Sequence, residues 1–144
     1  TRTFSKAFGL AGLRVGYLAA HSDLVLGLGR LYNPKSVNTL AQIGALAALE
    51  DLDYLNNYLD EVATSKELLR TFFATRPTAE AWVTPANFVV VRTPNVREAL
   101  ERLETLGVYV RDRSNYPGLE GCLRMSVGTV EQTQLLIDRL AKVF

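Results

Sequence analysis

A lysine, a serine and an arginine lie close together in sequence near the start of the chain, around a segment that contains glycines. Ser5 and Lys6 are adjacent, and Arg14 follows the glycines Gly9 and Gly12. Lysine is the side chain that forms Schiff bases with aldehydes. A guanidinium binds phosphate oxygens through two parallel hydrogen bonds, and a hydroxyl adds a further donor. These residue types together indicate a site for an aldehyde that carries a phosphate, held across a tight turn.

Ser-Lys pairs are common, so their spacing alone is weak evidence for such a site. The alternative interpretation makes Lys6 a solvated surface residue and Arg14 a member of a structural ion pair. His21 has no Cys, Asp or Glu at metal-ligand spacing, so we expect no metal site there.

A second candidate site involves two arginines in the last third of the chain. Side chains alternate between the two faces of a strand, so Leu123 and Met125 should face the core while Arg124 faces away. The same alternation turns Arg111 away from the core. We therefore expect both arginines on one side of neighbouring strands, where they form a receptor for a carboxylate or a phosphate. The alternative for Arg111 is an ordinary surface residue at a strand end.

Helices and strands alternate along the chain and predict an α/β or α+β layer structure. The segment around Trp82, between Pro77 and Pro85, has no clear assignment. Asn95 and Thr129 have the sequence pattern of helix N-caps, and Gly107 that of a helix end. The expected strands cover residues 1–6, 13–20, 87–92, 108–111 and 122–128, and the expected helices cover 23–31, 39–50, 51–74, 95–106 and 129–144.

Composition excludes several classes of protein. Lys plus Arg number 16 against 15 Asp plus Glu, so no basic surface for nucleic acid is expected. No apolar stretch reaches membrane-spanning length. The single cysteine, Cys122, cannot form an internal disulfide, which favours a cytoplasmic location. The chain opens at Thr1 inside an expected strand, so we expect it to be a piece of a longer polypeptide.

The run from Thr3 to Tyr17, which contains Ser5-Lys6 followed by Gly12-Leu13-Arg14-Val15-Gly16, resembles the lysine motif of pyridoxal-phosphate-dependent aminotransferases of fold type I. The resemblance implies that Lys6 forms the Schiff base with pyridoxal 5'-phosphate and moves a proton between substrate and cofactor. It also implies that Ser5 and Arg14 hold the cofactor phosphate.

The C-terminal part resembles histidinol-phosphate aminotransferases in particular. The likeness rests on residues 86–95, 110–114, 117–124 and 127–129, and it weakens at 32–38. It implies that Arg124 binds the anionic group of the substrate and that Arg111 assists it.

This resemblance implies an α/β fold, the C-terminal part of a fold-type I transferase. Residues 1–50 would then end the large cofactor-binding domain and include the connecting helix, and residues 51–144 would form the small domain. The activity implied is transfer of an amino group from histidinol phosphate or an amino acid to a 2-oxo acid such as 2-oxoglutarate, by a homodimer. The 144 residues alone are expected to be inactive.

Two alternatives stay open. One is a pyridoxal-phosphate-dependent decarboxylase of the threonine-phosphate type, and the other is a non-catalytic α+β module that binds anions.

Overall fold

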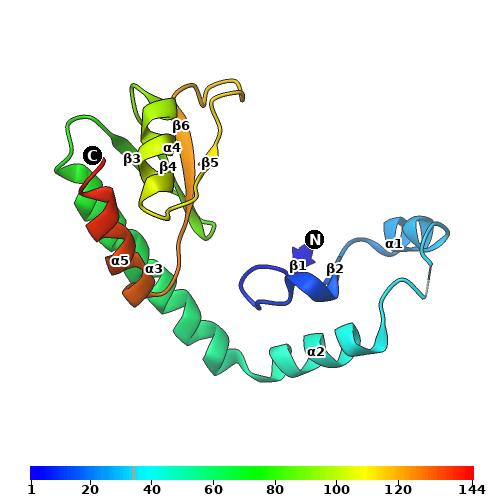
Figure 1. Ribbon diagram of the computed structural model, residues 1–144. Coiled ribbons are helices and arrows are strands. Elements are labelled where there is room, and N and C mark those ends of the chain that lie inside the picture. Colours follow the sequence, from blue (N-terminus) through cyan, green and yellow to red (C-terminus); the bar gives the residue numbers. More distant parts are fainter. Residues whose placement is uncertain (34) are drawn as a thin grey trace. The chain divides into compact units, whose positions relative to one another are not determined.

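The computed structural model describes residues 1–33 and 35–144, and the chain forms two compact units, Thr1–Leu59 and Asp60–Phe144 (Figure 1). Helix α3 (Leu52–Ala74) passes from the first unit into the second at Asp60. Within the expected loop at 32–38, Pro34 lies outside the described residues.

The first unit contains a small hairpin followed by helices. Strands β1 and β2 pair antiparallel, with Thr3 opposite Gly16. A short 3-10 helix, η1, lies between them. The elements are β1 (Arg2–Thr3), η1 (Ala11–Leu13), β2 (Gly16–Tyr17), α1 (Ser22–Gly29), α2 (Thr39–Glu50) and the start of α3 (Leu52–Ala74).

The second unit is a four-stranded sheet with helices. The strand order is β3-β4-β6-β5, and all neighbouring strands are antiparallel. In Figure 1, α5 lies alongside the C-terminal half of α3, and the ring of Phe73 packs edge-on against Phe144 at 5.6 Å. The elements are β3 (Glu80–Val83), β4 (Phe88–Arg92), α4 (Val96–Thr105), β5 (Arg111–Asp112), β6 (Cys122–Ser126) and α5 (Val130–Leu140).

Local hydrogen bonds explain where the helices begin and end. Asn95 caps α4 by accepting a bond from the Glu98 amide, and Thr129 forms a capping box with Gln132 at α5. At the end of α4 the amide of Gly107 donates to Glu104 and that of Val108 donates to Leu103, which is the Schellman pattern. Gly107 has φ +70, a conformation that favours glycine.

Alternating strand residues build the core of the second unit. Val89, Val91, Leu123 and Met125 are all buried, and so are Leu69, Leu103 and Leu140 from the three helices. Burial of a leucine side chain contributes about 1.5–3 kcal/mol. The expected inward face of the strand at Leu123 and Met125 is confirmed.

Most expected elements are confirmed, but three expected strands are shorter than predicted. The segment 1–6 contributes only Arg2–Thr3. The segment 13–20 contributes only Gly16–Tyr17, since η1 and a left-handed residue at Arg14 occupy its beginning. The strand expected at 108–111 begins only at Arg111, because the Schellman bonds hold the chain through Val108. The unassigned segment around Trp82 forms β3, which pairs with β4.

Candidate functional site

Two hydrogen bonds hold the main chain at Phe4, the residue just before Ser5 and Lys6. The Phe4 amide donates to the carbonyl of Val15 at 3.2 Å, and its carbonyl accepts from the amide of Leu10 at 3.0 Å. The Phe4 side chain is only 4% exposed, with ring centroids 4.8 Å from Phe8 and 6.0 Å from Tyr17. A buried aromatic anchor thus sets the position from which the next two residues project.

Lys6 begins a tight turn and presents its amine to solvent. Its carbonyl accepts a bond from the Gly9 amide at 2.9 Å, and Gly9 has φ +69. The Ser5 amide is bonded to Oγ1 of Thr3 at 3.1 Å. Within residues 1–33 and 35–144, the Lys6 side chain is exposed and forms no ion pair.

Arg14 adopts an unusual backbone conformation beside this turn. It has φ 53 and ψ 44, in the left-handed region, which costs a non-glycine residue about 1–2 kcal/mol. Its guanidinium donates to the Ala11 carbonyl at 3.1 Å. The bond from the Phe4 amide to Val15 extends the pairing of β1 and β2 by one residue, to the position next to Arg14. Strain of this kind is often retained at functional sites.

Glycines allow the backbone to approach closely around Arg14. A Cβ at Gly16 would lie 2.6 Å from the carbonyl oxygen of Arg2, so only glycine fits between β1 and β2 there. A Cβ at Gly44 on α2 would lie 2.9 Å from a methyl of Leu13. Together with the buried Ala41 and Ala45, Gly44 lets η1 pack directly on α2. The glycines and alanines thus hold the segment between Lys6 and Arg14 in place.

The two arginines of the second unit lie directly opposite each other. Arg111 of β5 pairs with Arg124 of β6, and directly opposed residues project to the same face of a sheet. The predicted placement of these two residues on one side of neighbouring strands is confirmed. Arg111 is exposed and Arg124 half-buried, so one guanidinium is open to solvent and the other is partly withdrawn.

Arg124 is held by an aromatic ring. Its guanidinium carbon lies 5.3 Å from the ring centroid of Phe88, in cation–π range. Its Nε is buried and has no hydrogen-bond partner in the part of the chain that the structure describes. A buried donor without a partner is costly, and an anionic ligand would supply the missing acceptor. Phe88 was not recognised from the sequence, although strand alternation places it on the same face as Arg124.

The turn after β5 is ordered independently of these arginines. The Asp112 carboxylate accepts a bond from the Ser114 amide at 2.7 Å, and this backbone bond lowers the pKa of Asp112. Arg113 stacks on Tyr116 at 5.3 Å and donates to its hydroxyl at 3.3 Å. Arg113 therefore has its own partner, which favours a structural role.

The five candidate residues form two groups. Ser5, Lys6 and Arg14 lie in the first unit, and Arg111 and Arg124 lie opposite each other on the sheet of the second. Across residues 1–33 and 35–144 there is no group of three metal-ligating side chains. No helix among these described residues is long and apolar enough to cross a membrane.

Comparison with known proteins gives consistent matches. The family model of aminotransferase class I and II matches residues 1–140. The dihydroxyacetone phosphate transaminase of Campylobacter jejuni is 38% identical over 97% of this chain and 38% of its own length. The histidinol-phosphate aminotransferase of Roseiflexus castenholzii is 36% identical over 99% of this chain and 39% of its own.

A solved structure shows the same fold. Histidinol-phosphate aminotransferase from Sinorhizobium meliloti, in complex with pyridoxal-5'-phosphate, superposes with a TM-score of 0.86 at 28% identity. The match covers 98% of this chain and 39% of that one. The chain thus spans well under half the length of the proteins it matches.

Proposed function

The chain belongs to the class I and II aminotransferases, a pyridoxal-phosphate-dependent family of fold type I, and we propose that it carries the reactive lysine and the substrate-binding arginines of such an enzyme. The observation that carries this proposal is the hairpin of the first unit. In it an exposed lysine, a serine and an arginine with a left-handed backbone lie within ten residues of one another in the chain.

The residues at the hairpin fit pyridoxal phosphate. Lys6 offers an amine without an ion-pair partner among the described residues, and Arg14 and Ser5 offer donors for a phosphate. When bound, the cofactor supplies an aldehyde for the amino group and a ring that stabilises negative charge at the substrate Cα. We assign Lys6 Nζ to hold the cofactor covalently, and Ser5 and Arg14 to hold its phosphate.

Each of the candidate residues has its own role in the proposed amino transfer. With the cofactor bound, Nζ of Lys6 would accept the proton from the substrate Cα and hold it for return at the end of the transfer. Arg14 and Ser5 fix the orientation of the cofactor, which keeps Nζ within reach of that proton. Arg124, assisted by Arg111, binds the anionic group of the substrate and orients the bond that is broken.

We propose histidinol phosphate as the amino donor and 2-oxoglutarate as the acceptor. Two relatives are named for histidinol phosphate and for dihydroxyacetone phosphate, and both of these compounds are phosphate esters. Two opposed guanidiniums suit the charge of a phosphate as well as a carboxylate. Other amino acids remain alternative donors that the same arginines would accept.

Assembly and location are further parts of the proposal. We propose that the complete enzyme is a cytoplasmic homodimer. We also propose that residues 1–144 alone do not catalyse amino transfer, since the matched relatives have more than half of their length outside the matched region.

The test is a product analysis with the full-length protein, histidinol phosphate and 2-oxoglutarate. We expect glutamate to form in step with loss of histidinol phosphate, without carbon dioxide. Carbon dioxide released from threonine phosphate would instead establish the decarboxylase alternative. The anion-binding module would be favoured if the protein bound phosphate but catalysed neither amino transfer nor decarboxylation, and if Lys6→Ala bound phosphate as well as the unchanged protein.

A further inference from the structure

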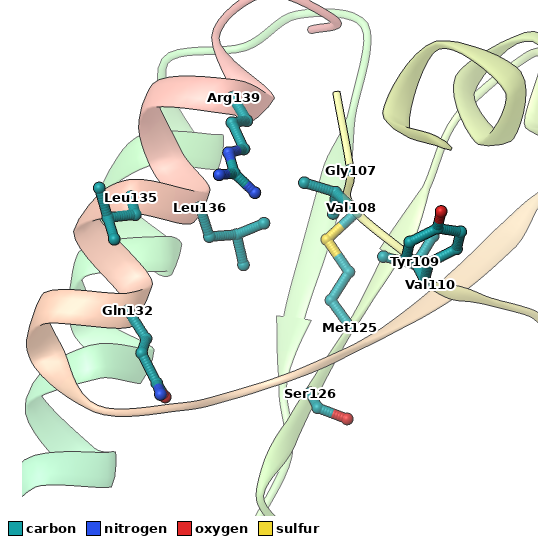
Figure 2. Close-up of a pocket in the computed structure, with 10 residues that line it drawn as sticks. All are labelled: Gly107, Val108, Tyr109, Val110, Met125, Ser126, Gln132, Leu135, Leu136 and Arg139. Atoms are coloured by element: carbon teal, nitrogen blue, oxygen red, sulfur yellow. The ribbon is translucent and has the colours of Figure 1, made fainter. Parts of the chain in front are cut away.

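The aromatic ring beside Arg124 belongs to a residue at the end of the sheet. Phe88 is the first residue of β4, and its partner in β6 is Ser126. On its other side Ser126 borders a pocket of about 570 Å³ instead of a strand, because the pairing of β6 with β5 ends at Arg124 (Figure 2). In the part of the chain that the structure describes, strand pairing therefore holds this end of β6 from the β4 side alone.

A threonine side chain continues the hold on β4 where its other neighbour ends. The pairing of β3 with β4 stops at Val83 opposite Val89, one residue before Thr84 would oppose Phe88. At that position the Thr84 hydroxyl donates to the Phe88 carbonyl at 2.6 Å, within the usual range for such a bond. Thr84 is half-buried, so this bond is partly shielded from water. The hydroxyl thus takes the place of a ladder bond at Phe88.

A lysine of α3 fixes the main chain of the same threonine. Nζ of Lys66 donates to the Thr84 carbonyl at 2.9 Å, and Lys66 is half-buried. Hydrogen bonds from a charged donor are stronger than those between neutral groups. Two bonds in series therefore connect α3 with Phe88, whose ring centroid lies 5.3 Å from the guanidinium carbon of Arg124.

We infer that Thr84 and Lys66 are positioning residues of the anion site, because they hold Phe88 against the guanidinium of Arg124. This inference rests on the proposed function, in which Arg124 binds the anionic group of the substrate. A guanidinium that already lies against a ring has less rotamer freedom to lose when it binds an anion. Loss of the support should therefore weaken substrate binding and leave the chemical step at Lys6 unchanged.

Steady-state kinetics of the full-length protein with histidinol phosphate test this split. Thr84→Val removes the hydroxyl at similar volume, and KM should rise about 3–10-fold while kcat stays within about 2-fold. Thr84→Ser keeps the hydroxyl and should restore KM. Thr64→Val is the matched control, because the Thr64 hydroxyl bonds to the Asp60 carbonyl at 3.0 Å on the exposed side of α3. The same KM for Thr84→Val and Thr64→Val would overturn the inference.

A double variant shows whether Thr84 acts through Arg124. In the Arg124→Gln background, Thr84→Val should change KM by less than about 2-fold, because the guanidinium that it positions is gone. An effect of full size in that background would show that Thr84 acts elsewhere and would overturn the inference. If Arg124→Gln itself left KM unchanged, the proposed function would fail at this site, and the chemical modification of Arg124 would still decide the positioning contact.

Arginine modification tests the positioning contact without amino transfer. The full-length protein would be treated with phenylglyoxal, and the rate at each arginine would be followed by peptide mass. We expect Arg124 to react about 3–10-fold faster in Thr84→Val and in Lys66→Met than in the unchanged protein, because its guanidinium is less often held against Phe88. The exposed Arg111 is the internal reference and should react at the same rate in all three proteins. An unchanged rate at Arg124 in either variant would overturn the inference.

Discussion

The two units of the chain hold their candidate residues by different means. The second unit has a core of its own, in which Leu103 and Leu123 are fully buried. In the first unit the buried apolar residues are Phe4, Ala41 and Ala45, while Leu40 is 72% exposed. Helices with exposed apolar faces are typical of surfaces that pack against further protein. The arginines are thus positioned by a self-contained sheet, and the lysine by a local hairpin.

This difference assigns separate tasks to the two units. Lys6 lies in a turn defined by short-range hydrogen bonds and a strained Arg14, features suited to holding a reactive group. Arg111 and Arg124 are fixed by strand register, which suits recognition of a charged substrate. Variants in the first unit should therefore affect the chemical step, and those in the sheet should affect binding.

The largest effect is expected at Lys6. Lys6→Arg keeps a cation but has no amine to condense with the cofactor aldehyde, so kcat should fall by about 10⁴-fold or more. The measurement is single-turnover amino transfer in the full-length protein. A fall of less than 10-fold would show that another group carries the chemistry.

A smaller and different effect is expected at Arg124. Arg124→Gln removes one of the two opposed guanidiniums, and kcat/KM for an anionic donor should fall by about 10²–10³-fold, mostly through KM. Arg113→Gln is the matched control, because Arg113 stacks on Tyr116. If steady-state kinetics gave the same kcat/KM for Arg124→Gln and Arg113→Gln, the arginine pair on the sheet would not be the group that binds the substrate.

Stability should distinguish the two units directly. Leu103→Ala empties a fully buried site and should lower the free energy of unfolding of the 144-residue chain by about 2–5 kcal/mol. Leu40→Ala removes a largely exposed side chain and should cost less than about 0.5 kcal/mol. Urea denaturation of both variants provides the comparison. Similar losses in the free energy of unfolding for the two variants would mean that the first unit has a core of its own.

The smallest effect concerns acid stability near the arginines. The backbone bond from Ser114 lowers the pKa of Asp112 in the folded state, so its contribution is present above its unfolded pKa of about 4 and is lost as pH falls through the lower folded value. Asp112→Asn should therefore lower Tm slightly at pH 6, and the difference should shrink as the pH falls below about 4 and the carboxyl takes up a proton. A difference that grew in acid would contradict this sign.

Much of the fold follows from short-range signals in the sequence. Richness in Ala and Leu predicts α2 and apolar spacing predicts α3, and the caps at Asn95 and Thr129 follow from their partners three residues later. Strand β3 was missed because Pro77 and Pro85 suggest a loop, and its pairing with β4 is a tertiary contact. The late start of β5 depends on the Schellman bonds of Val108 and on separation from β6.

The candidate site was also predictable where it depends on a local sequence pattern. Alternation along strands placed Arg111 and Arg124 on one face, and their direct pairing confirms that placement. The left-handed conformation of Arg14 and the stacking of Phe88 on Arg124 depend on neighbours that no local pattern specifies. The roles of the five residues stay predictions until they are tested.

The most direct test of the central claim is the site of cofactor attachment. The full-length protein would be incubated with pyridoxal phosphate, reduced with borohydride and mapped by peptide mass. We predict one adduct, on the peptide that contains Lys6, and none in Lys6→Arg. An unmodified Lys6 in the full-length protein, or an adduct on another lysine, would contradict the assignment of Lys6 as the residue that holds the cofactor.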